Sequence, residues 1–389
     1  MLIAVLTGCA TPPTATPSGP TAPSPSVGST AASSTAAPET PEATLAGPRL
    51  GETWADVDLG VEGEGYGVAY GEPGFVIVGR GCPFAGDCGR GQPTAWRSGD
   101  GTTWAPAEMP RARGAIPTVV AFNGSYVAAG SRSHNGQLEF LFWQSPDGID
   151  WTLLGSFERS CDNGCPLLEH LAVGTDGSII VTLEDRTHSG LGGPYRSADG
   201  AKWTRIEPTN FGYPKFATVK SADVAPMGSE LATVLSFGDD PAVAWSSADG
   251  IDWIRIGPID ARSIDDVSIS FDGAHLAAAI ASCGGGTCPT TVWVQTDDGS
   301  FRSAFPAGQL RSPRLAAVGT GSILLGVDLT VEPSPLRAWT TPDGTTWTEH
   351  PTGLDWTECE LRAIASGVSS VVAVGDPECS RPAVTAGAP

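Results

Sequence analysis

The sequence predicts an all-β protein built from repeated four-stranded units, and two observations support this prediction. First, the 389 residues include 50 Gly and 33 Pro, a composition that favours many turns over long helices. Second, a nine-residue segment with Ser, Asp and Gly between two aromatic residues, such as WSSADGIDW from Trp245, recurs along the chain. Short runs that alternate between apolar and polar residues separate successive copies, as expected of half-buried strands.

The repeated segment sets the period of the chain. Its other copies are WRSGDGTTW from Trp96, WQSPDGIDW from Trp143, YRSADGAKW from Tyr195, WTTPDGTTW from Trp339 and the degenerate VQTDDGSF from Val294. The aspartates of successive copies lie 45 to 52 residues apart, and a period near 50 indicates a repeat architecture. Three alternating runs precede each copy and a fourth begins at its last aromatic residue. Four short antiparallel strands per period are typical of a β-propeller blade, in which this segment joins the third strand to the fourth.

The chemistry of the repeated segment predicts a structural turn. Its Gly supplies the positive φ of a tight hairpin, and its Asp can accept hydrogen bonds from the N–H groups of the turn. The Ser or Thr two residues before the Asp can brace the loop. Six equivalent carboxylates in six blades cannot converge on one catalytic centre. We therefore expect a structural role for Asp100, Asp147, Asp199, Asp249, Asp298 and Asp343.

The number of copies predicts seven blades. Five clear copies and one degenerate copy account for six. The chain ends in three strand-like runs without a fourth, ELRAIAS, SVVAVGD and RPAVTAG, whereas ETWADVDLG from Glu52 resembles a fourth strand without the first three. Together they would complete a seventh blade and close the ring, which removes the sheet edges that promote aggregation. Six blades with extra flanking strands are the alternative.

The repeated segment resembles the Asp-box, or BNR repeat, of sialidase-like β-propellers. In that superfamily Ser-x-Asp-x-Gly-x-Thr-Trp forms the turn between the third and fourth strands, whereas here Asp and Gly are adjacent. The resemblance covers most of residues 50–389. It implies the blade architecture more strongly than an activity, because Asp-boxes recur in many non-hydrolytic propellers.

The resemblance also raises glycoside hydrolysis as an activity. Sialidases bind the substrate carboxylate with three arginines, use a Tyr paired with Glu as nucleophile and an Asp as acid, and carry Phe/Tyr-Arg-Ile-Pro in the first blade. In this chain RIEP, from Arg205, and RIGP, from Arg255, instead follow a repeated segment, and five Tyr are present in all. Tyr213 is the one loop tyrosine and the one catalytic candidate. We therefore expect a superfamily member that is not a true sialidase.

The first 48 residues predict a lipid anchor and a tether. Leu6-Thr7-Gly8-Cys9 resembles the bacterial lipobox, which implies cleavage before Cys9 and lipidation of its sulfur. No Lys or Arg precedes the apolar run, so we expect the natural start to lie upstream. Residues 10–48 consist mainly of Thr, Pro, Ser and Ala and cannot bury enough apolar surface to fold. The prediction is a signal remnant at 1–9, a disordered tether at 10–48 and a propeller at 49–389, located outside the cytoplasm and anchored to the bacterial cell membrane.

The cysteine count agrees with an oxidising compartment. Eight cysteines remain besides Cys9, mostly as close pairs, and an even number favours disulfides. Zinc binding is the alternative, but no CxxC knuckle is present. We expect the disulfides Cys82–Cys88, Cys161–Cys165, Cys283–Cys288 and Cys359–Cys379. All four fall in loops that follow second or fourth strands, so they share one face of the propeller.

The face with these cysteines is the predicted ligand-binding face, because long loops carry many binding sites. Arginines gather in the same loops and could bind an anion through their guanidinium groups; salt bridges to neighbouring carboxylates are the alternative. The candidates are Arg111, Arg113, Arg159, Arg262, Arg311, Arg314 and Arg362. Glu169 and His170 begin a first strand and could line the central tunnel.

Charge and motifs exclude several functions. A net charge of -21 argues against nucleic acid, whose phosphates need a basic face. We expect no cofactor and no metal centre, although the pairs Asp239-Asp240 and Asp265-Asp266 could hold Ca²⁺. The prediction is a monomeric, membrane-anchored scaffold that binds a protein or a glycan. The alternatives are a sialidase-like exo-glycoside hydrolase and an assembly factor for a membrane complex.

Overall fold

The chain divides into two units, residues 1–45 and 46–389. The computed structural model describes residues 54–57, 59, 63–81, 91–110, 118–134, 137–160, 166–184, 192–215, 217, 219–238, 240–261, 264–283, 287–319, 321–357, 359–368, 370–376 and 383–387, all in the second unit. In these ranges no helix is long and apolar enough to cross a membrane. The helical element that they contain is the 3₁₀ helix η2 (Pro208–Phe211).

The other elements are β-strands, and each pairs antiparallel with its neighbours. The strands of the N-terminal half are β1 (Trp54–Asp56), β2 (Gly63–Gly71), β3 (Gly74–Gly81), β4 (Gln92–Ser98), β5 (Ala105–Glu108), β6 (Thr118–Phe122), β7 (Ser125–His134), β8 (Gln137–Ser145), β9 (Thr152–Ser160), β10 (Leu167–Val173), β11 (Ile179–Glu184), β12 (Gly193–Ser197) and β13 (Trp203–Arg205). Those of the C-terminal half are β14 (Val219–Met227), β15 (Glu230–Phe237), β16 (Val243–Ser247), β17 (Ile254–Pro258), β18 (Asp266–Phe271), β19 (Leu276–Ala281), β20 (Pro289–Gln295), β21 (Phe301–Val318), β22 (Gly321–Asp328), β23 (Pro335–Thr341), β24 (Thr348–Asp355), β25 (Leu361–Ser366), β26 (Ser370–Gly375) and β27 (Ala383–Gly387).

Consecutive strands form four-stranded meanders. The orders β2-β3-β4-β5, β6-β7-β8-β9, β10-β11-β12-β13 and β14-β15-β16-β17 each make one sheet. The long strand β21 pairs with β20 through its first half and with β22 through its second half. It therefore joins two four-stranded groups, β18-β21 and β21-β24, into one sheet of seven strands. The all-β class and the four-stranded antiparallel sheets that the sequence predicts are confirmed.

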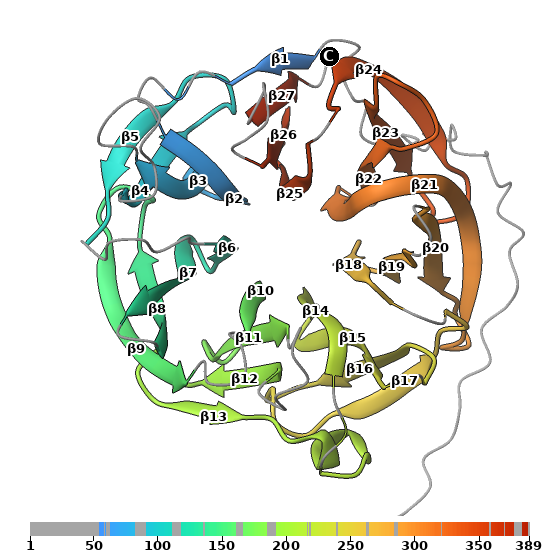
Figure 1. Cartoon of the computed structure of the whole chain (residues 1–389), viewed down its shortest axis with the longest axis horizontal. Helices are drawn as coiled ribbons and strands as arrows, with labels where there is room; N and C mark the ends of the chain where they lie inside the picture. Colours follow the sequence, from blue (N-terminus) through green and yellow to red (C-terminus); the bar gives the residue numbers. More distant parts are fainter. Residues whose placement is uncertain are drawn as a thin grey trace, which may run out of the picture. The chain divides into compact units, whose positions relative to one another are not determined.

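The remaining sheet combines strands from both ends of the second unit. Strand β1 pairs with β27, with Trp54 opposite Ala386, in the order β1-β27-β26-β25. The first strands of successive sheets contact one another in the order β2, β6, β10, β14, β18, β21, β25, and β25 in turn contacts β2. In Figure 1 these first strands lie nearest the middle of the view, whereas fourth strands such as β5, β13 and β17 lie outermost.

The hydrophobic core lies between neighbouring sheets. Val76 and Val78 of β3 share a cluster with Tyr126 of β7 and Trp143 of β8, and all four side chains are buried. An equivalent cluster contains Trp54 of β1 together with residues of β22, β23, β25 and β26. Because each strand alternates its side chains between two faces, one sheet presents an apolar face to each of its two neighbours.

The repeated turn joins the third and fourth strands of its sheet, as the sequence predicts. Between β8 and β9, Asp147 Oδ1 accepts hydrogen bonds from the N–H groups of Ile149 (2.8 Å) and Asp150 (2.9 Å), and Gly148 N–H donates to Ser145 Oγ (2.8 Å). These backbone donors hold the pKa of Asp147 below its usual value. The same bonds recur around Asp100, Asp199 and Asp249. The carboxylate is thus committed to the turn itself.

Candidate ligand-binding site

Five of the first strands, β2, β10, β14, β21 and β25, carry a β-bulge opposite their second strand. A bulge adds one residue to one strand and redirects a side chain that regular alternation would place elsewhere. The extra residue is Tyr66 in β2, Glu169 in β10 and Arg362 in β25. Each bulge lies toward the start of its first strand, on the side of the loops that carry the predicted disulfides. The bulges therefore bring polar side chains to the face that the sequence predicts to bind a ligand.

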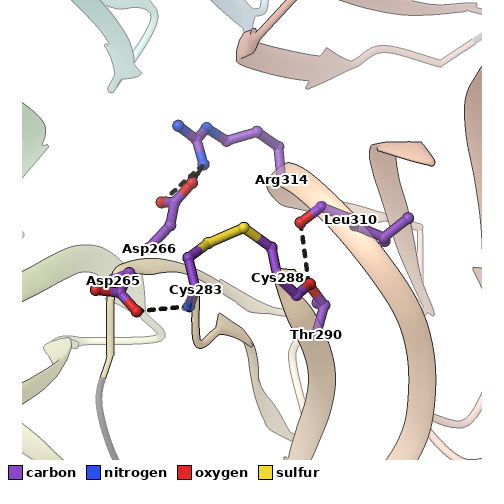
Figure 2. The surroundings of a disulfide bond; sticks show 7 residues. All are labelled: Asp265, Asp266, Cys283, Cys288, Thr290, Leu310 and Arg314. Carbon is purple, nitrogen blue, oxygen red and sulfur yellow. Dashed lines mark hydrogen bonds and ion pairs between the residues drawn. A yellow bond between two sulfur atoms is a disulfide. The ribbon is translucent and has the colours of Figure 1, made fainter. Parts of the chain in front are cut away.

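The bulge of β21 positions Arg314. It contains Ser312, a non-glycine residue with φ 49, which is an unfavourable conformation that the surrounding structure must hold in place. Arg314 Nη1 lies 3.0 and 2.9 Å from the two carboxylate oxygens of Asp266, and Nε donates to the carbonyl oxygen of Arg362 (3.0 Å). Figure 2 shows this pair beside the Cys283–Cys288 disulfide. Burial alone would lower the pKa of Arg314, but Asp266 outweighs it and raises the pKa.

A second ion pair joins β10 to β14. His170 Nδ1 lies 2.9 Å from Asp223 Oδ1, and the Asp223 side chain is 9% exposed. Asp223 also accepts hydrogen bonds from the N–H groups of Val224 (2.7 Å) and Ile269 (2.7 Å). Because Ile269 belongs to β18, this one carboxylate links three successive sheets. Burial would lower the pKa of His170, but the charge of Asp223 and the hydrogen bond to it raise the pKa instead.

Glu169 is the extra residue at the bulge of β10. Among the described residues, none makes a hydrogen bond or ion pair with its half-buried carboxyl group. Burial, reinforced by the charges of Glu184 and Asp266, raises its pKa to about 8, although His170 and Arg314 act in the opposite direction. The neutral form of Glu169, which can donate a hydrogen bond, is therefore favoured up to a higher pH than for an ordinary Glu. We call Glu169, His170, Asp223, Asp266 and Arg314 the inner-strand cluster.

A separate polar group lies at the bulge of β2. Tyr66 donates a hydrogen bond to Glu64 Oε2 (2.7 Å), and Arg80 Nε of β3 donates to the same oxygen (3.1 Å). Burial and the bond to Glu64 raise the pKa of Tyr66. The phenol is therefore held in its neutral form, the opposite of what a phenolate nucleophile requires.

Of the arginines that the sequence predicts to bind a ligand, the structure places only some close to one another. Arg314 and Arg362 are in contact, and Arg362 Nη2 pairs with Asp376 (2.5 Å) and Glu360 (3.3 Å). Arg159, on β9, instead stacks over the rings of Phe157 and Tyr195. Arg311 lies half-buried on β21. Arg111, Arg113 and Arg262 lie outside the described residues. An anion would have to compete with carboxylates for both Arg314 and Arg362.

Tyr213 packs against aromatic side chains. Its ring stacks on Phe237 with centroids 4.0 Å apart and meets the edge of Trp245 at 6.4 Å. Burial raises its pKa, so it stays protonated. Packing against these aromatic rings accounts for Tyr213, so no catalytic role is needed to explain it.

Of the predicted disulfides, Cys283–Cys288 is present between β19 and β20. Cys283 N–H donates to Asp265 Oδ2 (2.6 Å), so the disulfide is tied to the residue next to Asp266 (Figure 2). Asp265 thus binds the backbone of the disulfide loop and Asp266 pairs with Arg314, while Ca²⁺ binding by these two residues stays a prediction. Cys359 is also disulfide-bonded. Its predicted partner Cys379, the pairs Cys82–Cys88 and Cys161–Cys165, and the acidic residue Asp239 lie outside the described residues.

The sequence contains a signal for the inner-strand cluster that its motifs do not reveal. Glu169, Asp223, Asp266 and Arg314 follow one another at intervals of about 50 residues, the period of the repeat itself. Charged residues spaced near the repeat period, in first strands where buried apolar residues would be expected, are therefore the pattern to look for.

No protein-family model and no curated protein matches this sequence. Among solved structures, a protein of unknown function from Dyadobacter fermentans is similar at 17% identity and TM-score 0.46, over 70% of this chain and 93% of that chain. A Trypanosoma rangeli sialidase in complex with the inhibitor DANA is 12% identical with TM-score 0.47, over 73% and 56%. A glycosyl hydrolase from Bacteroides ovatus is 13% identical with TM-score 0.37, over 69% and 82%. The chain thus matches little more than half of the sialidase, and likenesses at these TM-scores assign it no activity.

Proposed function

We propose that this protein is a lipid-anchored, extracytoplasmic β-propeller of seven blades that binds a glycan at the inner-strand cluster. The observation that carries the proposal is the convergence of five polar side chains from four successive first strands, β10, β14, β18 and β21. A small-ligand site typically holds a few well-placed polar groups at a point where several elements meet.

The pairing of charges favours a ligand with hydroxyl groups over an anion. Arg314 is paired with the carboxylate of Asp266, and His170 with that of Asp223. A sugar hydroxyl can donate to Asp266 or accept from Arg314 without displacing either ion pair, because each charged group retains spare hydrogen-bonding capacity. An anionic ligand would have to break those pairs.

Three contacts support seven blades in a closed ring. Strand β1 completes the sheet of β25–β27, and β25 contacts β2. Ser370 of β26 donates to the carbonyl oxygen of Asp100 (2.7 Å) in the turn of the β2–β5 sheet. Arg196 of β12 makes the equivalent bond to the carbonyl oxygen of Asp249 (2.6 Å) in the next sheet. A side chain of the last sheet and a side chain of a middle sheet thus each donate to a turn carbonyl oxygen of the following sheet, which supports a closed ring.

Two features support the proposed location outside the cytoplasm, a disulfide and a lipobox-like segment. The Cys283–Cys288 disulfide is of the kind that persists in an oxidising compartment. The lipobox-like segment before Cys9 and the Pro-rich residues 10–48 would supply the anchor and the tether.

Glycoside hydrolysis is the second candidate, and the raised pKa of Glu169 favours it. A protonated carboxyl group can act as the general acid that such a reaction needs. A nucleophile or a carboxylate base is also required, and Tyr66, whose pKa is raised, is poorly suited to the first role. We therefore place binding ahead of turnover.

The test is a glycan array probed with the purified protein, followed by a panel of fluorogenic glycosides that includes a sialoside. The proposal predicts binding of a subset of glycans, at least about tenfold weaker binding by Asp266→Asn, which disrupts an ion pair and its hydrogen bonds, and no turnover. Arg337→Met, which breaks the Asp328 and Glu349 pairs of a third strand, is the matched control and should bind as wild type. Turnover that Glu169→Gln abolishes would identify a hydrolase. No glycan binding, with a specific envelope protein retained instead, would favour an assembly factor.

A further inference from the structure

The Cys283–Cys288 disulfide lies beside the Asp266–Arg314 ion pair of the inner-strand cluster (Figure 2). Cys283 N–H donates a hydrogen bond to Asp265 Oδ2 (2.6 Å). Asp266, the next residue, opens β18 and supplies the carboxylate of the ion pair. One end of the disulfide is therefore hydrogen-bonded to the residue that directly precedes this carboxylate.

The other end of the disulfide is connected to the strand that carries the arginine. Thr290 is buried, and its hydroxyl oxygen lies 3.3 Å from the carbonyl oxygens of both Cys288 and Leu310. Leu310 and Arg314 both belong to β21, with Ser312 (φ 49) at the bulge between them. Because this backbone conformation is unfavourable, the strand has to be held on both sides of Ser312 for Arg314 to keep its direction.

A separate hydrogen bond holds the far side of the ion pair. Leu315 N–H donates to Ser268 Oγ (3.0 Å) and so joins β21 to β18 beyond the pair. Asp266 and Arg314 thus lie between two connections of the same strands, this hydrogen bond on one side and the disulfide on the other. Polar groups that are already held in their binding geometry lose less conformational entropy when a ligand binds.

The disulfide is also open to reduction. Cys283 is exposed and Cys288 is half-buried, whereas Cys359, which is also disulfide-bonded, is 1% exposed. Exposed disulfides react with thiols more readily than buried ones. A dithiol attacks one sulfur as a thiolate, the S–S bond breaks, and its second sulfur then displaces the cysteine sulfur to which the first was joined. The dithiol is oxidised to a disulfide, and both cysteines take up a proton and become thiols.

We infer that the Cys283–Cys288 disulfide positions the Asp266–Arg314 pair for the ligand, and that reduction of this disulfide weakens ligand binding. The inference rests on the proposed glycan-binding function and adds two positioning residues to its site. Once the bond is broken, the chain ends bound to Asp265 and Thr290 no longer constrain each other. Asp266 and Arg314 then sample a wider range of separations, and a ligand has to order them when it binds.

The first measurement needs no ligand. Urea unfolding of wild type, Asp266→Asn, Arg314→Met and the variant with both changes gives the coupling between the two side chains. The set is repeated in a background with Cys283→Ser and Cys288→Ser. We expect removal of the disulfide to reduce the non-additive part of the shift in the unfolding midpoint to about half or less. A purely structural role of the disulfide would lower all midpoints and leave this coupling unchanged.

A second ion pair and a second background complete this measurement. Asp328–Arg337 (3.1 Å), probed with Asp328→Asn and Arg337→Met, is the matched control, and its coupling should not depend on the disulfide. Thr290→Val disconnects Leu310 from Cys288 but keeps the disulfide, so it should also reduce the Asp266–Arg314 coupling, and it serves if the cysteine variant does not fold. Unchanged Asp266–Arg314 coupling in these backgrounds would overturn the inference.

The second measurement is the glycan array, read with wild type and with the Cys283→Ser/Cys288→Ser variant, each before and after treatment with dithiothreitol. We expect the reagent to weaken binding by wild type about threefold to tenfold, the cost of ordering a side chain during binding. The variant should bind as weakly as reduced wild type and should not respond to the reagent. No loss in wild type, or an equal further loss in the variant, would contradict the inference. No binding by untreated wild type would contradict the proposed function, while the coupling would still test how the pair is positioned.

Discussion

Gly148 shows how closely the repeated turn packs against the neighbouring sheet. Its φ is 80, and a Cβ atom at this position would lie 2.5 Å from Val76 Cγ2 of β3. Gly148→Ala should therefore lower the free energy of unfolding by about 2–4 kcal/mol. This figure adds the cost of a left-handed backbone conformation at a non-glycine residue to the cost of a steric overlap in the core. Gly124, with φ 73 and no atom within 4 Å of a Cβ, provides the control. Gly124→Ala should cost only about 1 kcal/mol; equal losses in urea unfolding would show that the contact between sheets contributes nothing.

Glu169 gives a second test at the scale of one residue. Its pKa of about 8 in the folded chain lies above the value of about 4.3 expected when unfolded. Between these values the folded state binds more protons, so this group makes the protein less stable as pH rises through the window. Glu169→Gln should match wild type near pH 4 and be more stable by about 1–3 kcal/mol near pH 9, after allowance for partial exposure. A difference that does not change with pH would contradict the assignment.

At the scale of elements, the Arg314–Asp266 pair connects the bulge of β21 to β18. The side chains are 17% and 26% exposed, so removing one partner leaves a charge that water screens only in part. Arg314→Met or Asp266→Asn alone should destabilise by about 1–3 kcal/mol, and the double variant by clearly less than the sum. Chemical denaturation of all four proteins measures the coupling. Additive effects would mean that the pair does not hold the two strands together.

The elements also show what the sequence can and cannot predict. The Asp147 turn depends on Ser, Asp and Gly within four residues, so both its conformation and its place between two strands could be predicted. The inner-strand cluster includes Glu169 and Arg314, which are far apart in the chain and lie at bulges in β10 and β21. Alternation of apolar and polar residues does not report an inserted residue. The sequence therefore singled out Glu169, His170 and Arg314 without placing them together, and it grouped Arg314 with arginines such as Arg159, which stacks on aromatic rings instead.

At the scale of the whole molecule, the proposed closure depends on the strand nearest the N-terminus. Trp54 is 9% exposed and packs with Leu354 and Trp356, while Val57 and Leu59 pack against the β2–β5 sheet. Removing residues 1–59 should therefore lower the free energy of unfolding by at least about 3–5 kcal/mol, the loss expected for one buried Trp alone. Removing residues 1–45, which belong to the other unit, should leave the thermal midpoint unchanged. Equal midpoints for the two truncated proteins would contradict closure by β1.

The central claim is that the inner-strand cluster is where the protein recognises a glycan. The most direct measurement is a crystal structure of the protein with the tightest-binding sugar from the array. The account predicts that the sugar lies within hydrogen-bonding distance of Glu169 at the bulge of β10 and of Asp266 at the start of β18. A sugar bound at the opposite face, beside the turns of Asp147 and Asp249, would contradict it.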